Sequence, residues 1–432
     1  MTGYLSPAVE VRKLARLIGA DAEDLAYFER LDGQVIRDLR DQVTVVLYDT
    51  DRQLLQRVAT ATKLIPAKLA AVIGERAFGP LLCARVTGLL DPSRAVDIAN
   101  HLPVTFLAAL ALHLDPRRAS RVIGEMPPAT VAAIAGELAA GEEYIVMGGF
   151  VGHLSKAALL AALDAVDDES LLRTAYVIEE KQNIAALVAL LPDERLDDVI
   201  ATASSAELWV EALDVLDHVT ERQRGALGDL AAAQDDEVLD SMVRAALSHE
   251  LWSEVLPVVR AMSPESRKRF ATLKSIQARR VLQTIIDAAA EDSLWAELLV
   301  LLPLLPTTAR RQVAALATSF DLGLFAQIVS TAHEEELWPA LIAFAAELDK
   351  GPRREMAKLI DGSDDDVLES LLGAVHDAGL EADLVAVLRE LPATAQRRLG
   401  TRVATAPAEV VQALTGAADA AALEPFSKAL TK

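Results

Sequence analysis

Few residues of this 432-residue chain combine the side-chain types and the spacing that catalysis or metal binding requires. The seven histidines include no His-Glu-x-x-His pair, the spacing that places two imidazoles on one zinc ion. The single cysteine, Cys83, lies in an apolar helical stretch, which favours a buried small hydrophobe over a nucleophile. The sequence contains neither a glycine-rich phosphate loop nor the Gly-x-Ser-x-Gly turn of hydrolases. We therefore predict a protein that is not an enzyme and that holds no cofactor or metal.

Basic residues recur at a fixed spacing of 43 residues in the second half of the chain. Four arginines lie at equivalent positions of successive 43-residue segments. The next position along the chain is also basic in the second, third and fourth of these segments and in the one that follows them. Together they form a basic ladder: Arg224, Arg267, Lys268, Arg310, Arg311, Arg353, Arg354 and Arg397. One interpretation is a set of ion pairs with the surplus acidic residues, and the other is a groove for an acidic peptide or a polyanion. The sequence leaves both interpretations open.

A second candidate site lies where glycines interrupt the helical pattern. Gly148, Gly149 and Gly152 fall within a few residues of one another, and each weakens a helix by about 1 kcal/mol relative to alanine. This segment is expected to be a hinge, a tight helix crossing or the wall of a ligand pocket. The pocket residues would be Tyr144, Met147, Gly148, Gly149 and His153.

Charge and composition exclude several classes of protein. There are 42 basic and 64 acidic residues, and the net charge of −22 argues against binding to nucleic acid or to an anionic membrane. No apolar run approaches the roughly 20 residues of a membrane span, and no signal peptide is visible, so we expect a cytoplasmic protein. Apolar residues make up 52% but aromatic ones only 4%, which favours a core of alanine, leucine and valine between close-packed helices.

The elements that carry the basic ladder repeat with the same period. All four tryptophans, Trp209, Trp252, Trp295 and Trp338, are spaced by 43 residues. Apolar residues after Trp209 follow the i, i+3, i+4, i+7 pattern of an amphipathic helix, and three such helices fit one period. Repeats of this length are typical of armadillo- or HEAT-like α-solenoids. Because the tryptophans share the apolar stripe, we interpret them as core residues between repeats rather than as the lining of a ligand groove.

The first half of the chain repeats at a shorter period. The segment 90–103, which begins Leu-Asp-Pro-Ser-Arg-Ala, matches the segment 114–127, 24 residues later. In each copy we expect the aspartate to cap a helix that the proline opens. Residues 60–140 resemble the helical repeats in the N-terminal domain of MgtE-type magnesium transporters and in the flagellar motor switch protein FliG. The resemblance implies a right-handed superhelix that contacts partner domains. No part of this sequence resembles a transport pore, so the resemblance does not imply that this protein is a transporter.

These patterns predict an all-α protein, a right-handed α-solenoid with two-helix repeats of about 24 residues followed by three-helix repeats of 43. The expected segments are an N-terminal helical cap (1–60), a short-period solenoid (61–140), a glycine-broken junction (141–182) and a 43-residue-repeat solenoid with a C-terminal capping helix (183–432). We expect a non-enzymatic scaffold or adaptor that binds a protein partner, such as an acidic peptide. The alternative is a cytosolic carrier or sensor for an apolar small molecule near residues 141–153. The oligomeric state is not indicated.

Overall fold

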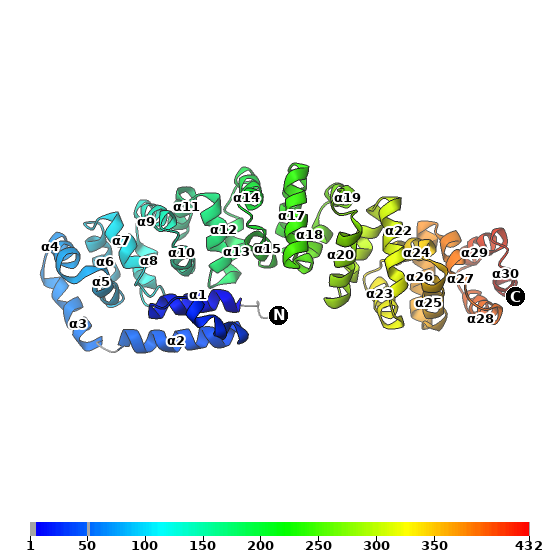
Figure 1. Cartoon of the computed structure of the whole chain (residues 1–432), viewed down its shortest axis with the longest axis horizontal. Coiled ribbons are helices and arrows are strands. Elements are labelled where there is room, and N and C mark those ends of the chain that lie inside the picture. The colour runs from blue at the N-terminus through cyan, green and yellow to red at the C-terminus, as the bar shows by residue number, and fades with distance from the viewer. Residues whose placement is uncertain (1–5, 50–51, 432) are drawn as a thin grey trace. The chain divides into compact units, whose positions relative to one another are not determined.

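The computed structural model describes residues 6–49 and 52–431, and within them the chain forms 30 α-helices and no strand (Figure 1). The prediction of an all-α protein is confirmed. The chain divides into two compact units, Met1–Val219 and Thr220–Lys432. None of the described helices combines the length and the apolar character that crossing a membrane requires. The predicted boundaries at residues 60, 140 and 182 remain predictions.

The first unit contains fifteen helices of unequal length. They are α1 (Pro7–Ile18), α2 (Gly33–Asp49), α3 (Arg52–Ala61), α4 (Ala67–Ile73), α5 (Gly79–Thr87), α6 (Pro92–Ala99), α7 (Val104–Ala111), α8 (Ser120–Glu125), α9 (Pro128–Ala140), α10 (Tyr144–Phe150), α11 (Lys156–Ala165), α12 (Asp168–Val177), α13 (Ile184–Val188), α14 (Asp193–Ser205) and α15 (Trp209–Asp217). Helices α4 to α7, α9, α10 and α12 each pack against the helix two further along the chain. Figure 1 shows α1 and α2 running beside α8 to α12.

One expected helix start in this unit is wrong. Pro92 opens α6 as predicted, but the side chain of Asp91 at its N-cap forms no capping hydrogen bond. Pro116, the counterpart of Pro92 in the second copy, lies in a turn, and α8 begins only at Ser120. The reason is local, because the Asp115 carboxylate accepts a hydrogen bond from the backbone N–H of Arg117 at 3.0 Å. An aspartate that closes this short turn favours it over a helix.

The second unit contains the other fifteen helices. They are α16 (Glu221–Ala233), α17 (Asp236–His249), α18 (Trp252–Ala261), α19 (Pro264–Thr272), α20 (Arg279–Glu291), α21 (Trp295–Leu301), α22 (Thr307–Leu316), α23 (Leu322–Glu334), α24 (Trp338–Glu347), α25 (Lys350–Gly362), α26 (Asp365–Ala378), α27 (Glu381–Leu388), α28 (Ala393–Val403), α29 (Ala408–Ala420) and α30 (Glu424–Leu430). Helices α19, α22, α25 and α28 begin 43 residues apart, and so do α18, α21, α24, α27 and α30.

Tryptophans fill the core of the second unit, as predicted. Trp252, Trp295 and Trp338 are each no more than 2% exposed. A buried indole N–H needs an acceptor, and each finds one 32 residues later on a following helix. The acceptors are Thr284 Oγ1 at 3.0 Å, Gln327 Oε1 at 3.2 Å and Ser370 Oγ at 3.0 Å. The hydrogen bond fixes the orientation of each indole while its rings fill the space between helices.

The helices that precede these tryptophans end in the same backbone geometry. Glu250, Ser293, Glu336, Gly379 and Ala422 are 43 residues apart and all adopt positive φ, between 54° and 68°. The N–H of the residue that follows then donates to the carbonyl five residues before it, for example Leu294 N to Ala289 O at 3.0 Å. This is the left-handed helix end that glycine favours, although only Gly379 is a glycine.

Candidate functional site

The basic ladder separates into two columns with different environments. The first column, Arg267, Arg310 and Arg353, lies on α19, α22 and α25 and is half-buried. Its guanidinium groups donate to backbone carbonyls between the first and second helix of each repeat. These bonds join Arg267 to Met262 O at 2.8 Å, Arg310 to Leu305 O at 3.4 Å and Arg353 to Leu348 O at 2.6 Å. The three carbonyls are themselves 43 residues apart, so one contact recurs in each repeat.

Gln396 shows what this column does. It occupies the same register on α28, is buried, and donates to Leu391 O at 2.8 Å through its uncharged amide. This position therefore needs a side chain that donates a hydrogen bond, because the backbone carbonyls at the end of the preceding helix have no partner within that helix. Arg310 also pairs with Glu347 at 3.1 Å, and Arg353 lies 3.9 Å from Glu390. Each arginine of the first column thus has a partner inside the protein, and ligand binding by these three residues remains a prediction.

The second column points into solvent. Lys268, Arg311, Arg354 and Arg397 are all exposed, and we call them the exposed basic column. Within the described part of the chain, none has an acidic side chain within ion-pair distance. Arg397 donates only to Ala393 O of its own helix, at 3.2 Å. The eighth ladder residue, Arg224 on α16, is half-buried, has an interaction partner, and is followed by Gly225, so the exposed basic column begins at Lys268.

The helices that carry the exposed basic column concentrate positive charge. Helices α19, α22 and α25 each hold two more basic than acidic residues, and α28 holds three more. By contrast, α26 holds four acidic and no Lys or Arg residues. A net charge of −22 over the whole chain makes this concentration of positive charge stand out. The arrangement can attract an acidic ligand.

The glycine-broken junction is a tight helix crossing. A Cβ on Gly148 would lie 3.2 Å from the backbone of Val177, and a Cβ on Gly152 would lie 2.6 Å from Glu180 Oε2. A Cβ on Gly149 would lie 3.6 Å from the ring of Pro116. The glycines therefore let α10 and the turn after it approach the end of α12 and the chain that follows it.

The other predicted pocket residues pack at the same crossing. Met147 Sδ accepts a hydrogen bond from Thr174, and the Tyr144 ring lies 5.9 Å below the Arg173 guanidinium. Burial and the nearby Glu142 raise the pKa of Tyr144. His153 is half-buried in the turn after α10. These residues form a packed crossing, and their role as a ligand site remains a prediction.

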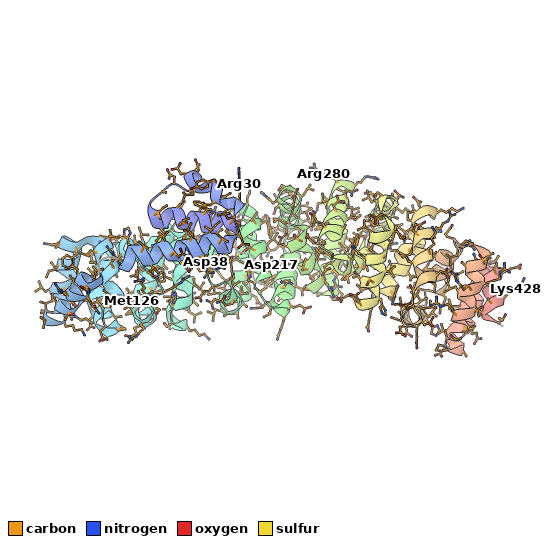
Figure 2. The ribbon with its side chains drawn as sticks, turned by 90° about the horizontal axis from the view of Figure 1, so that it is seen from below. Arg30, Asp38, Met126, Asp217, Arg280 and Lys428 are labelled. Carbon is orange, nitrogen blue, oxygen red and sulfur yellow. The ribbon has the colours of Figure 1, made fainter. Side chains whose placement is uncertain are left out.

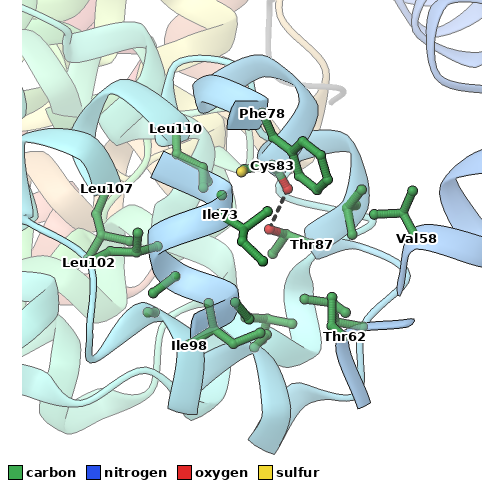
Figure 3. A pocket seen from close by; sticks show the side chains of 18 of the residues that line it. Val58, Thr62, Ile73, Phe78, Cys83, Thr87, Ile98, Leu102, Leu107 and Leu110 are labelled. Atoms are coloured by element: carbon green, nitrogen blue, oxygen red, sulfur yellow. Dashed lines mark hydrogen bonds between the residues drawn. The ribbon is translucent and has the colours of Figure 1, made fainter. Parts of the chain in front are cut away.

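An apolar cavity lies elsewhere in the first unit, among α3 to α9, and the sequence analysis did not predict it. Its volume is ≈ 370 Å³, and its lining side chains converge on one space in Figure 3. Small residues at facing positions, such as Ala70, Ala71, Ala95 and Ala99, leave part of this space. Their number was a usable signal, but alanine-rich helices usually pack closely instead, so composition alone could not locate a cavity.

Cys83 lines this cavity. It is half-buried, and burial raises the pKa of its thiol to about 11. A thiol with that pKa is protonated at neutral pH and is a poor nucleophile. This agrees with the interpretation of Cys83 as a small hydrophobe.

Comparison with known proteins assigns no family, because no protein-family model, no curated protein and no solved structure matches the chain. The resemblance of residues 60–140 to transporter and motor-switch repeats therefore remains a prediction. Within residues 6–49 and 52–431, no three His, Cys, Asp or Glu residues are grouped so that they could hold a metal ion. The candidate sites are thus a charged surface in the second unit and an apolar cavity in the first.

Proposed function

We propose that the chain is a right-handed α-solenoid and a cytoplasmic, non-enzymatic scaffold that binds an acidic segment of a partner protein. The regular helix starts of the second unit support the solenoid, as does packing chiefly between helices close in sequence. In such an array, equivalent positions of successive repeats face the same side and form an extended binding surface. The proposed partner surface is the exposed basic column.

One observation carries this proposal: four exposed cations share one register, and no acidic side chain among residues 6–49 and 52–431 pairs with them. The adjacent first column binds backbone carbonyls, whereas the cations of the exposed basic column form no ion pair within the described part of the chain. The surrounding acidic surface repels an acidic ligand, so attraction is restricted to the helices that carry the column. A segment with carboxylates spaced along an extended chain would meet successive cations.

The expected affinity is modest and salt-dependent. Each exposed ion pair contributes about 0.2–1 kcal/mol, so four pairs give at most a few kcal/mol before other contacts are added. Salt screens exposed charges, and affinity should therefore fall as ionic strength rises. These properties suit a reversible adaptor.

The test uses the full-length protein and a fluorescein-labelled decaglutamate peptide, with binding followed by fluorescence anisotropy. Reversing the exposed basic column (Lys268→Glu, Arg311→Glu, Arg354→Glu and Arg397→Glu together) should weaken binding by about tenfold or more. A matched control reverses four exposed cations outside the column: Arg222, Lys274, Arg279 and Arg280. Figure 2 shows Arg280 projecting from the surface. The control should weaken binding by no more than about threefold.

Three results would overturn the proposal. The first is no binding by the wild-type protein at low salt. The second is an equal loss in both quadruple variants, which would show attraction by net charge alone. The third is preferential, column-dependent binding of a DNA duplex over decaglutamate, which would make the partner a nucleic acid. Circular dichroism melting of both variants establishes that they are folded.

A further inference from the structure

The cavity of the first unit opens partly onto the surface, so it is a pocket rather than a sealed void between helices. At ≈ 370 Å³ this cavity lies within the usual range of small-molecule sites, about 300–1,000 Å³. It is bounded by several helices of one compact unit, from Val58 on α3 to Ile134 on α9.

The lining carries no charge and offers no free hydroxyl donor. Thr87 Oγ1 donates to Cys83 O at 2.8 Å, the bond drawn in Figure 3, and Thr62 Oγ1 donates to Ala59 O at 2.7 Å. Both hydroxyl protons are thus held by the protein's own helices. The remaining lining side chains are aliphatic apart from Phe78, Met126 and the neutral thiol of Cys83. An ionised ligand group buried here would lose its hydration without gaining a partner.

An irregular segment borders the cavity. Residues Gly74–Phe78 form a π-helical turn between α4 and α5, and Gly79 follows with φ of 73°. Such turns are rare and often mark functional sites. Phe78 lines the cavity and is 40% exposed, and Leu69, Val72 and Leu81 nearby in the chain are also exposed apolar side chains. Phe78 thus belongs both to the cavity lining and to the exposed surface, so the cavity reaches solvent at this turn.

From the size, the lining and the bordering turn, we infer that this cavity is a binding site for an uncharged, mainly hydrocarbon small molecule such as a medium-chain alcohol. The inference places a ligand site among α3 to α9 instead of at the 141–153 crossing. It does not depend on the exposed basic column, which belongs to the other unit. The ligand makes van der Waals contact with the aliphatic walls, and its hydroxyl group can donate to a threonine oxygen.

The first test uses the wild-type protein and the uncharged, apolar fluorescent probe N-phenyl-1-naphthylamine. We expect saturable binding at one site and displacement by 1-decanol. Decanoate has the same chain with a carboxylate, and it should compete about tenfold less well or worse. No saturable binding would overturn the inference. Equal competition by the alcohol and the carboxylate would overturn the assignment of an uncharged ligand.

The second test reads occupancy at the cavity itself, without a mutation. Because Cys83 is the chain's one cysteine, N-ethylmaleimide reports on a single position. Saturating 1-decanol should slow modification by about fivefold or more, because only the unoccupied fraction reacts. Unchanged modification in the presence of bound 1-decanol would place the ligand elsewhere and overturn the inference.

Variants locate the site independently. Ile98→Trp fills the cavity and should abolish binding of the fluorescent probe, whereas Leu54→Trp adds the same side chain at an exposed position outside the lining. Leu54→Trp should retain wild-type affinity. Circular dichroism melting shows whether each variant is folded. Full binding by a folded Ile98→Trp protein would overturn the inference, and the cysteine experiment decides the matter if that variant does not fold.

Discussion

The two compact units differ in how they use apolar side chains. In the second unit, three tryptophans are almost fully buried and each indole has a hydrogen-bond acceptor. The first unit contains a cavity of ≈ 370 Å³. Among the described residues, all exposed large apolar side chains except Leu322 belong to the first unit.

The difference follows from the regularity of the repeats. When each helix begins at the same point of a 43-residue period, a large side chain meets an equivalent gap in every repeat. Helices of unequal length and irregular turns provide no such recurring gap, so small residues face one another and space remains. A regular unit is therefore suited to a continuous surface, and an irregular unit is suited to an internal site.

The two units also place charges differently. In the first unit, Glu10 and Lys13 are at most 4% exposed and pair at 3.0 Å, while Arg40 donates to Glu179 at 2.5 Å. Arg117 joins the same cluster through Glu179 at 3.3 Å. These charges bind α1 and α2 to the chain beyond α12. In the second unit, the half-buried arginines of the first column bind backbone carbonyls instead.

The largest effect should come from removing a core tryptophan. Trp295→Ala should lower the free energy of unfolding of the second unit by about 3–5 kcal/mol, because it leaves a cavity and an unpaired acceptor on Gln327. In the first unit, Phe78→Ala removes a side chain that is already 40% exposed and should cost about 1–2 kcal/mol. Hydrogen exchange measured by mass spectrometry assigns each loss to its unit. Equal losses would contradict the contrast in packing.

Breaking the buried charge cluster should have the next largest effect. Glu179→Gln removes the nearest carboxylate of Arg40, which then keeps only the more distant Glu10 and Asp41 at 3.6 and 3.8 Å, and should weaken the docking of α1 and α2 by about 2–3 kcal/mol. Hydrogen exchange of α1 measures this loosening. The control is Glu169→Gln, which breaks an exposed ion pair with Arg173 and should change stability by less than about 0.5 kcal/mol.

The same cluster predicts a pH dependence. Burial alone would raise the pKa of Glu179, but Arg40, Lys13 and Arg117 outweigh it and hold the pKa below its usual value of 4.5. The carboxylate therefore stabilises the folded state above the usual pKa, and this stability is lost as pH falls through the lower, folded-state value. The protection of the α1 amides, corrected for the intrinsic pH dependence of exchange, should fall in acid in the wild type, and Glu179→Gln should flatten this dependence. An equally steep acid response in both proteins would exclude Glu179 as its source.

Much of the second unit could be predicted because the same signal occurs in several repeats. The tryptophan register and the basic ladder were both visible at a spacing of 43 residues. The division of the ladder into two columns could also have been inferred. Arg267 precedes the buried Phe270 and Ala271 by three and four residues, which places it on the inward face of α19.

The first unit was less predictable for physical reasons. Asp115-Pro116 has the sequence of a helix start, yet a turn closed by the aspartate side chain prevails there. The cavity arises from the arrangement of helices α3 to α9, and no local pattern specifies the distance between them. The buried pair of Arg40 and Glu179 joins residues 139 positions apart, so sequence spacing gave no indication of it.

The smallest effect should come from the helix ends that recur in the second unit. Gly379 has φ of 68°, and an added Cβ would touch nothing within 4 Å, so Gly379→Ala introduces backbone strain alone. We expect it to lower the free energy of unfolding by about 1 kcal/mol. Gly373, inside the same helix α26, also has open space around it, and Gly373→Ala should raise stability by about 0.5–1 kcal/mol. Urea denaturation midpoints of the two variants should therefore shift in opposite directions. Shifts in the same direction would show that Gly379 is not needed for the left-handed end of α26. They would also show that the recurring positive φ does not set the repeat boundary.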